Sequence, residues 1–153
     1  MKEHFQRLFQ HANWADRRVL DVLRKQSPDN ERARKLFCHV LAAERAWITR
    51  LGGQDSATIP IWPDLSFDDC ASWLEQNAAS YSQFLDDLTA DGLDHVITYR
   101  NSKGAEFNTP VQEVLTHVAL HGAGHRGQIA AALRDAGNEP ANTDFITFVR
   151  EVQ

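Results

Sequence analysis

The sequence predicts an all-α protein, a four-helix bundle with a small β-hairpin before its fourth helix and a short C-terminal helix. Three observations favour this fold. Apolar residues recur at helical spacing in four long stretches, glycine and proline interrupt the chain between them, and one short segment has strand-like composition. We expect residues 1–153 to form a single domain, because this length suits one hydrophobic core.

Two helices are predicted before residue 54. The first covers about residues 2–26 and ends at Ser27-Pro28, where serine suits the cap and proline the first turn of the next helix. The second ends at Gly52-Gly53, since glycine is common just after a helix. The apolar face of the first helix contains Phe5, Leu8, Phe9, Ala12, Val19, Leu20 and Leu23, and that of the second contains Leu36, Phe37, Val40, Leu41, Trp47, Ile48 and Leu51.

The third helix is predicted after a proline-containing loop at residues 54–65. Ser66 followed by Asp69 resembles a capping box, which marks the start of a helix. We expect this helix to end near Asp91-Gly92.

A β-hairpin and two further helices complete the predicted fold. Residues 95–100 and 105–108 have strand-like composition on either side of a turn signal. Thr109-Pro110 is expected to open the fourth helix, with threonine as the cap and proline in the first position, and Gly137 to end it. A last short helix is predicted at about residues 143–150, packed on the bundle. Four long amphipathic helices are typical of a four-helix bundle.

The charge and the cysteines argue against several classes of partner. The formal net charge of −5 gives no basic face for nucleic acid and no attraction to anionic membrane surfaces. The N-terminal residues do not resemble a signal peptide, and no run of about 18 apolar residues is present. Cys38 and Cys70 lie outside any CxxC pattern, so we expect reduced thiols in a cytoplasmic protein.

Three histidines spaced by four residues are the most informative feature of the sequence. His121 and His125 fall inside the apolar stripe of the predicted fourth helix, and His117 falls on its flank. Imidazoles four residues apart are about 6 Å apart along the axis and can converge on one metal ion. His117 is about 12 Å along the axis from His125 and cannot join the same ion. Histidines that form hydrogen bonds inside the core are the other interpretation.

A third metal ligand must come from another helix. His39 is the leading candidate, although its place at the edge of an apolar face does not select it over His4 or His11. Gly122 and Gly124 lie between the paired histidines, and each costs helix stability of roughly 0.5–1 kcal/mol relative to alanine. We therefore expect a packed helix or a ligand to approach the backbone there.

Three motifs resemble those of the DinB family. Residues 121–128 read His-Gly-Ala-Gly-His-Arg-Gly-Gln and are similar to the His-x-x-x-His-Arg-Gly-Gln signature of that family. Residues 39–47, which begin with His39, resemble the motif that holds its first ligand, and residues 13–16, Asn-Trp-Ala-Asp, resemble its early tryptophan motif. Element order and the hairpin before the fourth helix also agree.

The resemblance implies further properties of the fold and the site. It implies an up-down-down-up bundle, a homodimer, and a metal site with His39, His121 and His125 as ligands. Zn or Ni are the foremost candidate ions, followed by Fe and Mn. The resemblance also implies a low-molecular-weight thiol as a possible cosubstrate, because relatives include thiol S-transferases and a thiol-dependent isomerase.

Three neutral histidines leave open positions on a metal ion, a feature of catalytic sites. We expect a metal-dependent enzyme that acts on a small molecule, either a thiol S-transferase or a hydrolase. A non-catalytic stress protein that binds metal or a small ligand is the alternative. Glu44 and His117 are candidate catalytic groups, Glu44 as a general base and His117 as a group that orients the substrate. A salt bridge for Glu44 and a simple hydrogen bond for His117 are the competing interpretations.

Four neighbouring residues receive weaker assignments. Asp16 lies within an apolar stripe and needs a partner, either a histidine of the site or an Arg or Trp N–H group. Arg126 points away from the histidines and is expected to form an ion pair at the surface. Gln128 borders the stripe and is expected to contact the cleft that the family resemblance implies beside the three-histidine site. Cys38 points about 100° away from His39 and is not expected to be a ligand.

Overall fold

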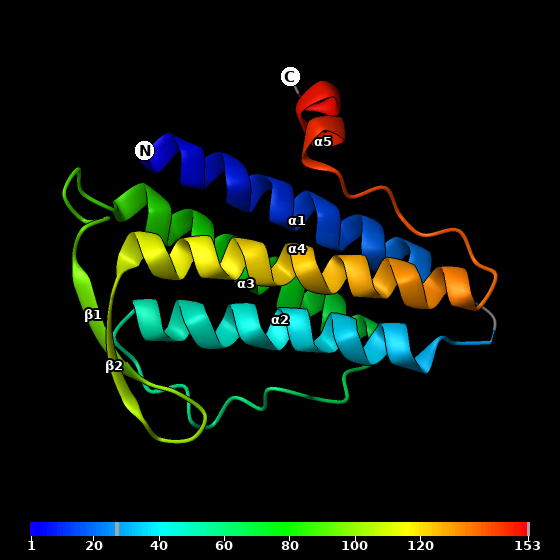
Figure 1. Ribbon diagram of the computed structural model, residues 1–153, viewed down its shortest axis with the longest axis horizontal. Coiled ribbons are helices and arrows are strands. Elements are labelled where there is room, and N and C mark those ends of the chain that lie inside the picture. The colour runs from blue at the N-terminus through cyan, green and yellow to red at the C-terminus, as the bar shows by residue number, and fades with distance from the viewer. Residues whose placement is uncertain (27, 153) are drawn as a thin grey trace.

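The computed structural model of the protein describes residues 1–26 and 28–152, and four long helices lie side by side in it (Figure 1). A two-stranded hairpin lies across one end of these helices, and a short helix follows them. This arrangement confirms the predicted fold class. The helices are α1 (Lys2–Arg24), α2 (Glu31–Leu51), α3 (Phe67–Asp87), α4 (Val111–Asp135) and α5 (Phe145–Glu151), and the strands are β1 (Val96–Arg100) and β2 (Glu106–Pro110).

The helices run up, down, down and up. The loop at residues 52–66 carries the chain back along the length of the bundle, so that α3 runs in the same direction as α2 (Figure 1). α2 packs most extensively against α4, and α1 against α3. The two helices that carry the histidine motifs are therefore neighbours.

Side chains cap α2 and α3 at their N-termini. The Asn30 side chain accepts a hydrogen bond from the Ala33 N–H at 3.0 Å, so α2 begins at Glu31, after the predicted start. The predicted cap, Ser27, lies outside the described residues. Asparagine is as good a cap as serine, so the later position serves equally well as the start of the helix. Ser66 caps α3 as predicted, because its hydroxyl accepts from the Asp69 N–H at 3.1 Å.

The start of α4 differs from the prediction. Thr109 and Pro110 pair with Ile97 and Val96 as the last residues of β2, so the helix begins at Val111 without a side-chain cap. Backbone carbonyls serve in place of the cap. The Val111 N–H donates to the His95 carbonyl at 2.9 Å, and the next N–H donates to the Leu93 carbonyl at 3.0 Å. The hairpin thus satisfies the first helical donors itself.

The hairpin begins where α3 has already ended. α3 stops at Asp87 rather than near Gly92, and a short turn segment leads to β1. The two strands pair in antiparallel register from Val96 opposite Pro110 to Arg100 opposite Glu106. The turn between them contains Gly104 at φ 82°, a conformation that glycine adopts without steric cost.

The interior of the bundle has two apolar clusters with a polar layer between them. One cluster gathers around Phe37 and Leu133, and the other around Phe9 and Leu115. The polar layer takes one side chain from each long helix. These buried residues are Asp16, Glu44, Asn77 and Arg126.

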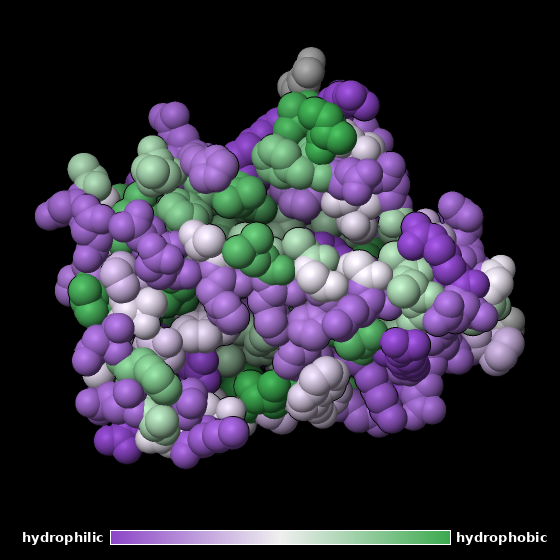
Figure 2. Space-filling view, viewed as in Figure 1, coloured by the Kyte–Doolittle hydropathy of each residue, from purple (hydrophilic) through white to green (hydrophobic). Residues whose placement is uncertain are grey.

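Polar residues cover most of the face shown in Figure 2, with apolar residues scattered among them. Within residues 1–26 and 28–152, the helices are too short or too polar to cross a bilayer.

Candidate metal centre

Three histidine side chains converge between α2 and α4. His39 comes from α2, and His121 and His125 lie one turn apart on α4. The Nε2 atom of His121 lies 3.3 Å from Nε2 of His39 and 3.1 Å from Nε2 of His125. One ring nitrogen from each histidine lies within 4.8 Å of the other two, which is close enough for the group to hold a metal ion.

Hydrogen bonds on the far side of two rings fix which nitrogen faces the centre. The Nδ1 atom of His39 lies 2.8 Å from the Ile61 carbonyl, and Nδ1 of His125 lies 2.7 Å from Oε1 of Gln128. Because both partners are acceptors, Nδ1 carries the hydrogen in each ring. The Nε2 atoms are then unprotonated, with their lone pairs directed at the centre.

This arrangement suits a cation better than a proton. If His121 is protonated at Nε2, it can donate to only one of its two neighbours, and the other contact then lacks a hydrogen. Burial, followed by the charges of His125, His39 and His117, lowers the pKa of His121 to about 4. Burial also lowers the pKa of His39. The His121 and His39 rings are therefore neutral at pH 7, and neutral imidazole is the form that binds metal.

Trp62 covers one face of the group. Its ring stacks on His39 with centroids 3.9 Å apart and an angle of 9° between the planes, while 60% of the tryptophan remains exposed. Ile61 and Trp62 belong to the loop that returns the chain from α2 to α3. No periodic pattern in the sequence predicts the path of this loop, so neither residue could be placed at the site from the sequence.

His117 lies beside the group but outside it. The centroid of its partly exposed ring lies 5.7 Å from that of the His121 ring and 5.2 Å from that of the Trp47 ring. Burial of the ring, and then the charge of Arg50, lower the pKa of His117. His117 therefore lies next to the three histidines, one turn of α4 closer to the hairpin than His121.

Glu44 lies in the interior polar layer and is not brought together with the histidines. It follows His39 by five residues, which turns it by about 140° around α2. The Asn77 amide donates to Glu44 Oε2 at 3.3 Å. Burial, together with the charge of Asp16, raises the pKa of Glu44 well above its usual range.

Arg126 is buried, and the predicted ion pair at the surface is wrong. Its Nη1 atom donates to Asp16 Oδ1 at 2.9 Å, and the two residues are only 4% and 1% exposed. A Cβ atom on Gly122 would lie 3.0 Å from this Nη1 atom. Glycine at this position lets the arginine fold back along α4 and reach α1. At Gly124 the expected close approach is absent, since a Cβ atom there meets nothing within 4 Å in the described structure.

The two cysteines lie apart from the histidines. Cys38 Sγ is 3.7 Å from Cys70 Sγ, and both are buried free thiols. Cys38 therefore faces α3 while its neighbour in the chain, His39, faces α4.

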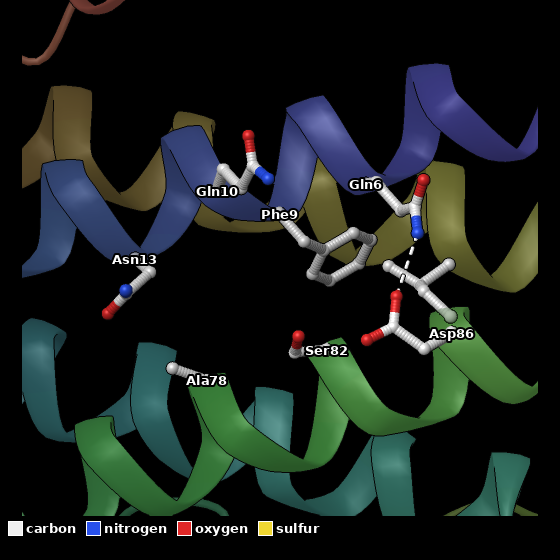
Figure 3. A pocket seen from close by; sticks show the side chains of 8 residues that line it. Gln6, Phe9, Gln10, Asn13, Ala78, Ser82 and Asp86 are labelled. Carbon is white, nitrogen blue, oxygen red and sulfur yellow. Dashed lines mark hydrogen bonds between the residues drawn. The ribbon is translucent and has the colours of Figure 1, made fainter. Parts of the chain in front are cut away.

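A cavity of about 180 Å³ opens between α1 and α3 (Figure 3). Amide and hydroxyl side chains line much of it, and the Gln6 side chain donates to Asp86 Oδ1 across one end at 2.9 Å. None of its lining residues is one of the three histidines, so it is separate from the metal centre.

A helical bundle with three converging histidines defines a class of protein that could hold a metal ion. The chain matches the DinB family over residues 1–151 and belongs to that family. It is similar to Protein DinB of Bacillus subtilis (strain 168), with 25% identity over an alignment 156 positions long that covers 91% of this chain and 90% of the relative.

Proposed function

We propose that the protein is a metal-dependent enzyme in which His39, His121 and His125 hold one divalent transition metal ion. The observation that carries this proposal is the convergence of three Nε2 atoms, two of which are kept unprotonated by hydrogen bonds at Nδ1. The family resemblance makes Zn and Ni the foremost candidates and Fe and Mn further ones, and imidazole nitrogen is a suitable ligand for Zn, Ni and Fe alike.

The charge of the ligand set indicates what kind of further ligand the ion would take, and this supports thiol chemistry and hydrolysis equally. Three neutral imidazoles leave the full charge of a divalent ion uncompensated, so an anionic group from the substrate or the solvent is the favoured further ligand. When bound, such an ion lowers the pKa of a coordinated water or thiol and polarises a carbonyl group. We therefore propose transfer of a low-molecular-weight thiol, or hydrolysis, with a small molecule as the substrate.

The protein's own residues shape the access to this site. Trp62 shields one face of His39, and its exposed edge offers an apolar surface to a substrate. The His117 ring lies next to that of His121, and the Trp47 ring lies next to that of His117. In this proposal His117 orients the substrate beside the ion, and Glu44 supports the fold from the interior rather than acting as a general base.

The test of catalysis is turnover that depends on the three histidines. Purified protein is assayed with low-molecular-weight thiols plus electrophiles, and with a panel of esters and amides. We expect turnover that a chelator abolishes, that the metal restores, and that the His121→Ala/His125→Ala variant lacks. His4→Ala removes an exposed histidine elsewhere and serves as the control. Stable metal retention without turnover in either panel would favour a binding protein without chemistry.

The homodimer that the resemblance implies stays a prediction. Leu120 on α4 and Ile146 on α5 are exposed apolar side chains that a partner subunit could cover. Light scattering coupled to gel filtration measures the mass directly.

A further inference from the structure

We propose that Arg50 forms an oxyanion-binding site at the hairpin end of the bundle, which takes a carboxylate or phosphoryl group of a small ligand. This site is separate from the three histidines, and the proposal does not depend on the metal.

Arg50 is a buried arginine whose guanidinium group has no carboxylate partner within the described part of the chain. It is 7% exposed, and no carboxylate within the described part of the chain lies within 4.0 Å of it. The charge of exposed Asp55 acts on it only from a greater distance. The other buried arginine, Arg126, contacts Asp16 at 2.9 Å. A buried charge costs free energy unless it is paired. A bound oxyanion would supply the negative charge that pairs with Arg50.

Three contacts hold the guanidinium group in a fixed orientation. Its Nε atom donates to the buried Ser56 hydroxyl at 2.8 Å. Its carbon atom Cζ lies 4.5 Å from the centre of the Trp47 ring and 5.5 Å from that of Tyr99, as in cation–π contacts. These partners come from α2, the following loop and β1. The orientation is thus set before any ligand binds.

The two terminal nitrogens remain free for a ligand. Neither Nη1 nor Nη2 has an acceptor among the described residues, and neither is sealed from solvent. A guanidinium group presents such paired N–H donors in the fork geometry that matches the two oxygens of a carboxylate or a phosphate.

Arg50 also lines a groove large enough for a small molecule. The groove has a volume of about 430 Å³ and lies between the ends of α2 and α3 and the strand β1. Gly52, Gly53 and Gly92 form part of its wall, so the backbone is accessible there. Volumes of this size are typical of small-ligand sites. Arg50 follows His39 by eleven residues, about 16 Å along α2, so the groove is distinct from the metal centre.

A purely structural role for Arg50 is the competing interpretation. A basic residue in the last turn of a helix is stabilised by the helix dipole, and the Arg50 guanidinium group lies over the Trp47 ring. Such a role requires no anion, so binding measurements separate the two.

The test is a titration of ¹⁵N-labelled protein with sodium phosphate and with sodium acetate, at an ionic strength held constant with sodium chloride. The readout is the Nε–Hε signal of Arg50 and the amide signals of Gly52 and Gly92. We expect saturable shifts in the wild type. The dissociation constants should be at least tenfold higher in Arg50→Met, and those of Arg50→Lys should lie between the values of the wild type and Arg50→Met. Saturation by phosphate alone identifies a phosphoryl site, and saturation by acetate alone identifies a carboxylate site.

Two control variants make the result specific. Arg45→Met removes another arginine that lies over a tryptophan, 3.7 Å from the Trp73 centre, but whose guanidinium already contacts Gln76 and Asn77. It should bind like the wild type, and so should His121→Ala/His125→Ala, which excludes an anion bound at the metal. Absence of saturation by both anions in the wild type, or unchanged binding in folded Arg50→Met, would overturn the proposal.

Discussion

At the residue scale, the direction of each imidazole lone pair depends on what the opposite ring nitrogen contacts. The Ile61 carbonyl and the Gln128 side chain hold Nδ1 of His39 and His125, so that both Nε2 atoms face His121. These two contacts therefore determine the ligand geometry as much as the histidines themselves do.

Part of this arrangement could be predicted from the residues. Helical periodicity predicts that His121 and His125 lie on one face of the helix, and it also places Gln128 at the border of the apolar stripe. His39 could be assigned as a ligand only from the family resemblance. The spacing of residues within one helix does not show which residues of another helix it contacts. The Ile61 carbonyl belongs to a loop, where no periodic pattern predicts which backbone oxygen meets a side chain.

Loss of the Gln128 contact should weaken the metal site without removing a ligand. We expect Gln128→Ala to reduce metal affinity about 10- to 100-fold, because Nδ1 of His125 loses its acceptor and the ring can turn. Gln128→Glu keeps an acceptor at the same position and should restore the affinity. Competition against a chromophoric chelator measures both.

Gln112→Ala on the same helix, whose side chain contacts Asp94, is the matched control and should bind metal like the wild type. Equal affinities for Gln128→Ala and the wild type would mean that the hydrogen bond does not orient His125.

At the element scale, the helices were predictable where side chains alone decide their bounds. Ser66 caps α3 as expected, and the four helical stretches follow their apolar periodicity. The start of α4 was not predictable from local residues, because strand pairing engages Thr109 and Pro110, and hairpin carbonyls receive the first helical N–H groups. Competition between a strand and a helix for the same residues is decided by tertiary contacts.

Replacing either of two glycines on α4 by alanine should change the free energy of unfolding in opposite directions. Gly124→Ala should raise the free energy of unfolding by about 0.5–1 kcal/mol, because alanine favours the helix and its Cβ meets nothing within 4 Å in the described structure. Gly122→Ala should lower it, because its Cβ would lie 3.0 Å from an arginine Nη1 held by Asp16. Urea denaturation measures both values.

The two variants are controls for each other, since they make the same chemical change two residues apart. A gain of stability in Gly122→Ala equal to that in Gly124→Ala would show that Arg126 moves freely, contrary to the buried ion pair.

At the scale of the whole molecule, the polar layer ties all four helices together between two apolar clusters. Asp16 and Arg126 join α1 to α4, Glu44 and Asn77 join α2 to α3, and the charges of Asp16 and Arg126 act on Glu44, which connects the two pairs. Since every long helix contributes one buried polar group, the layer favours one relative alignment of the helices over alternatives. It thereby places His39 opposite the pair on α4.

The stability of the bundle should depend on pH through Glu44. Burial raises its pKa in the folded protein, so between the ordinary value near 4.5 and the raised value the folded state binds more protons than the unfolded state. The contribution of Glu44 to stability is therefore present below pH 4.5 and decreases by up to about 1.4 kcal/mol per pH unit as the pH rises through this window. Glu44→Gln, which mimics the protonated carboxyl, should gain stability relative to the wild type over the same range.

Urea denaturation of both proteins at pH 4, 5.5 and 7 gives this difference. Glu113→Gln, at an exposed position on α4, is the control and should show a constant difference from the wild type. A difference for Glu44→Gln that does not change with pH would contradict a protonated Glu44 in the folded bundle.

The metal content of the purified, untagged protein tests the central claim most directly. Elemental analysis of the wild type, His121→Ala/His125→Ala and His4→Ala should give close to one equivalent of a transition metal in the first and third proteins and none in the second. The element found identifies the ion. Absence of metal from the wild type, persisting after reconstitution with Zn, Ni, Mn and Fe(II), would contradict the claim and leave the three histidines as hydrogen-bonding residues of the core.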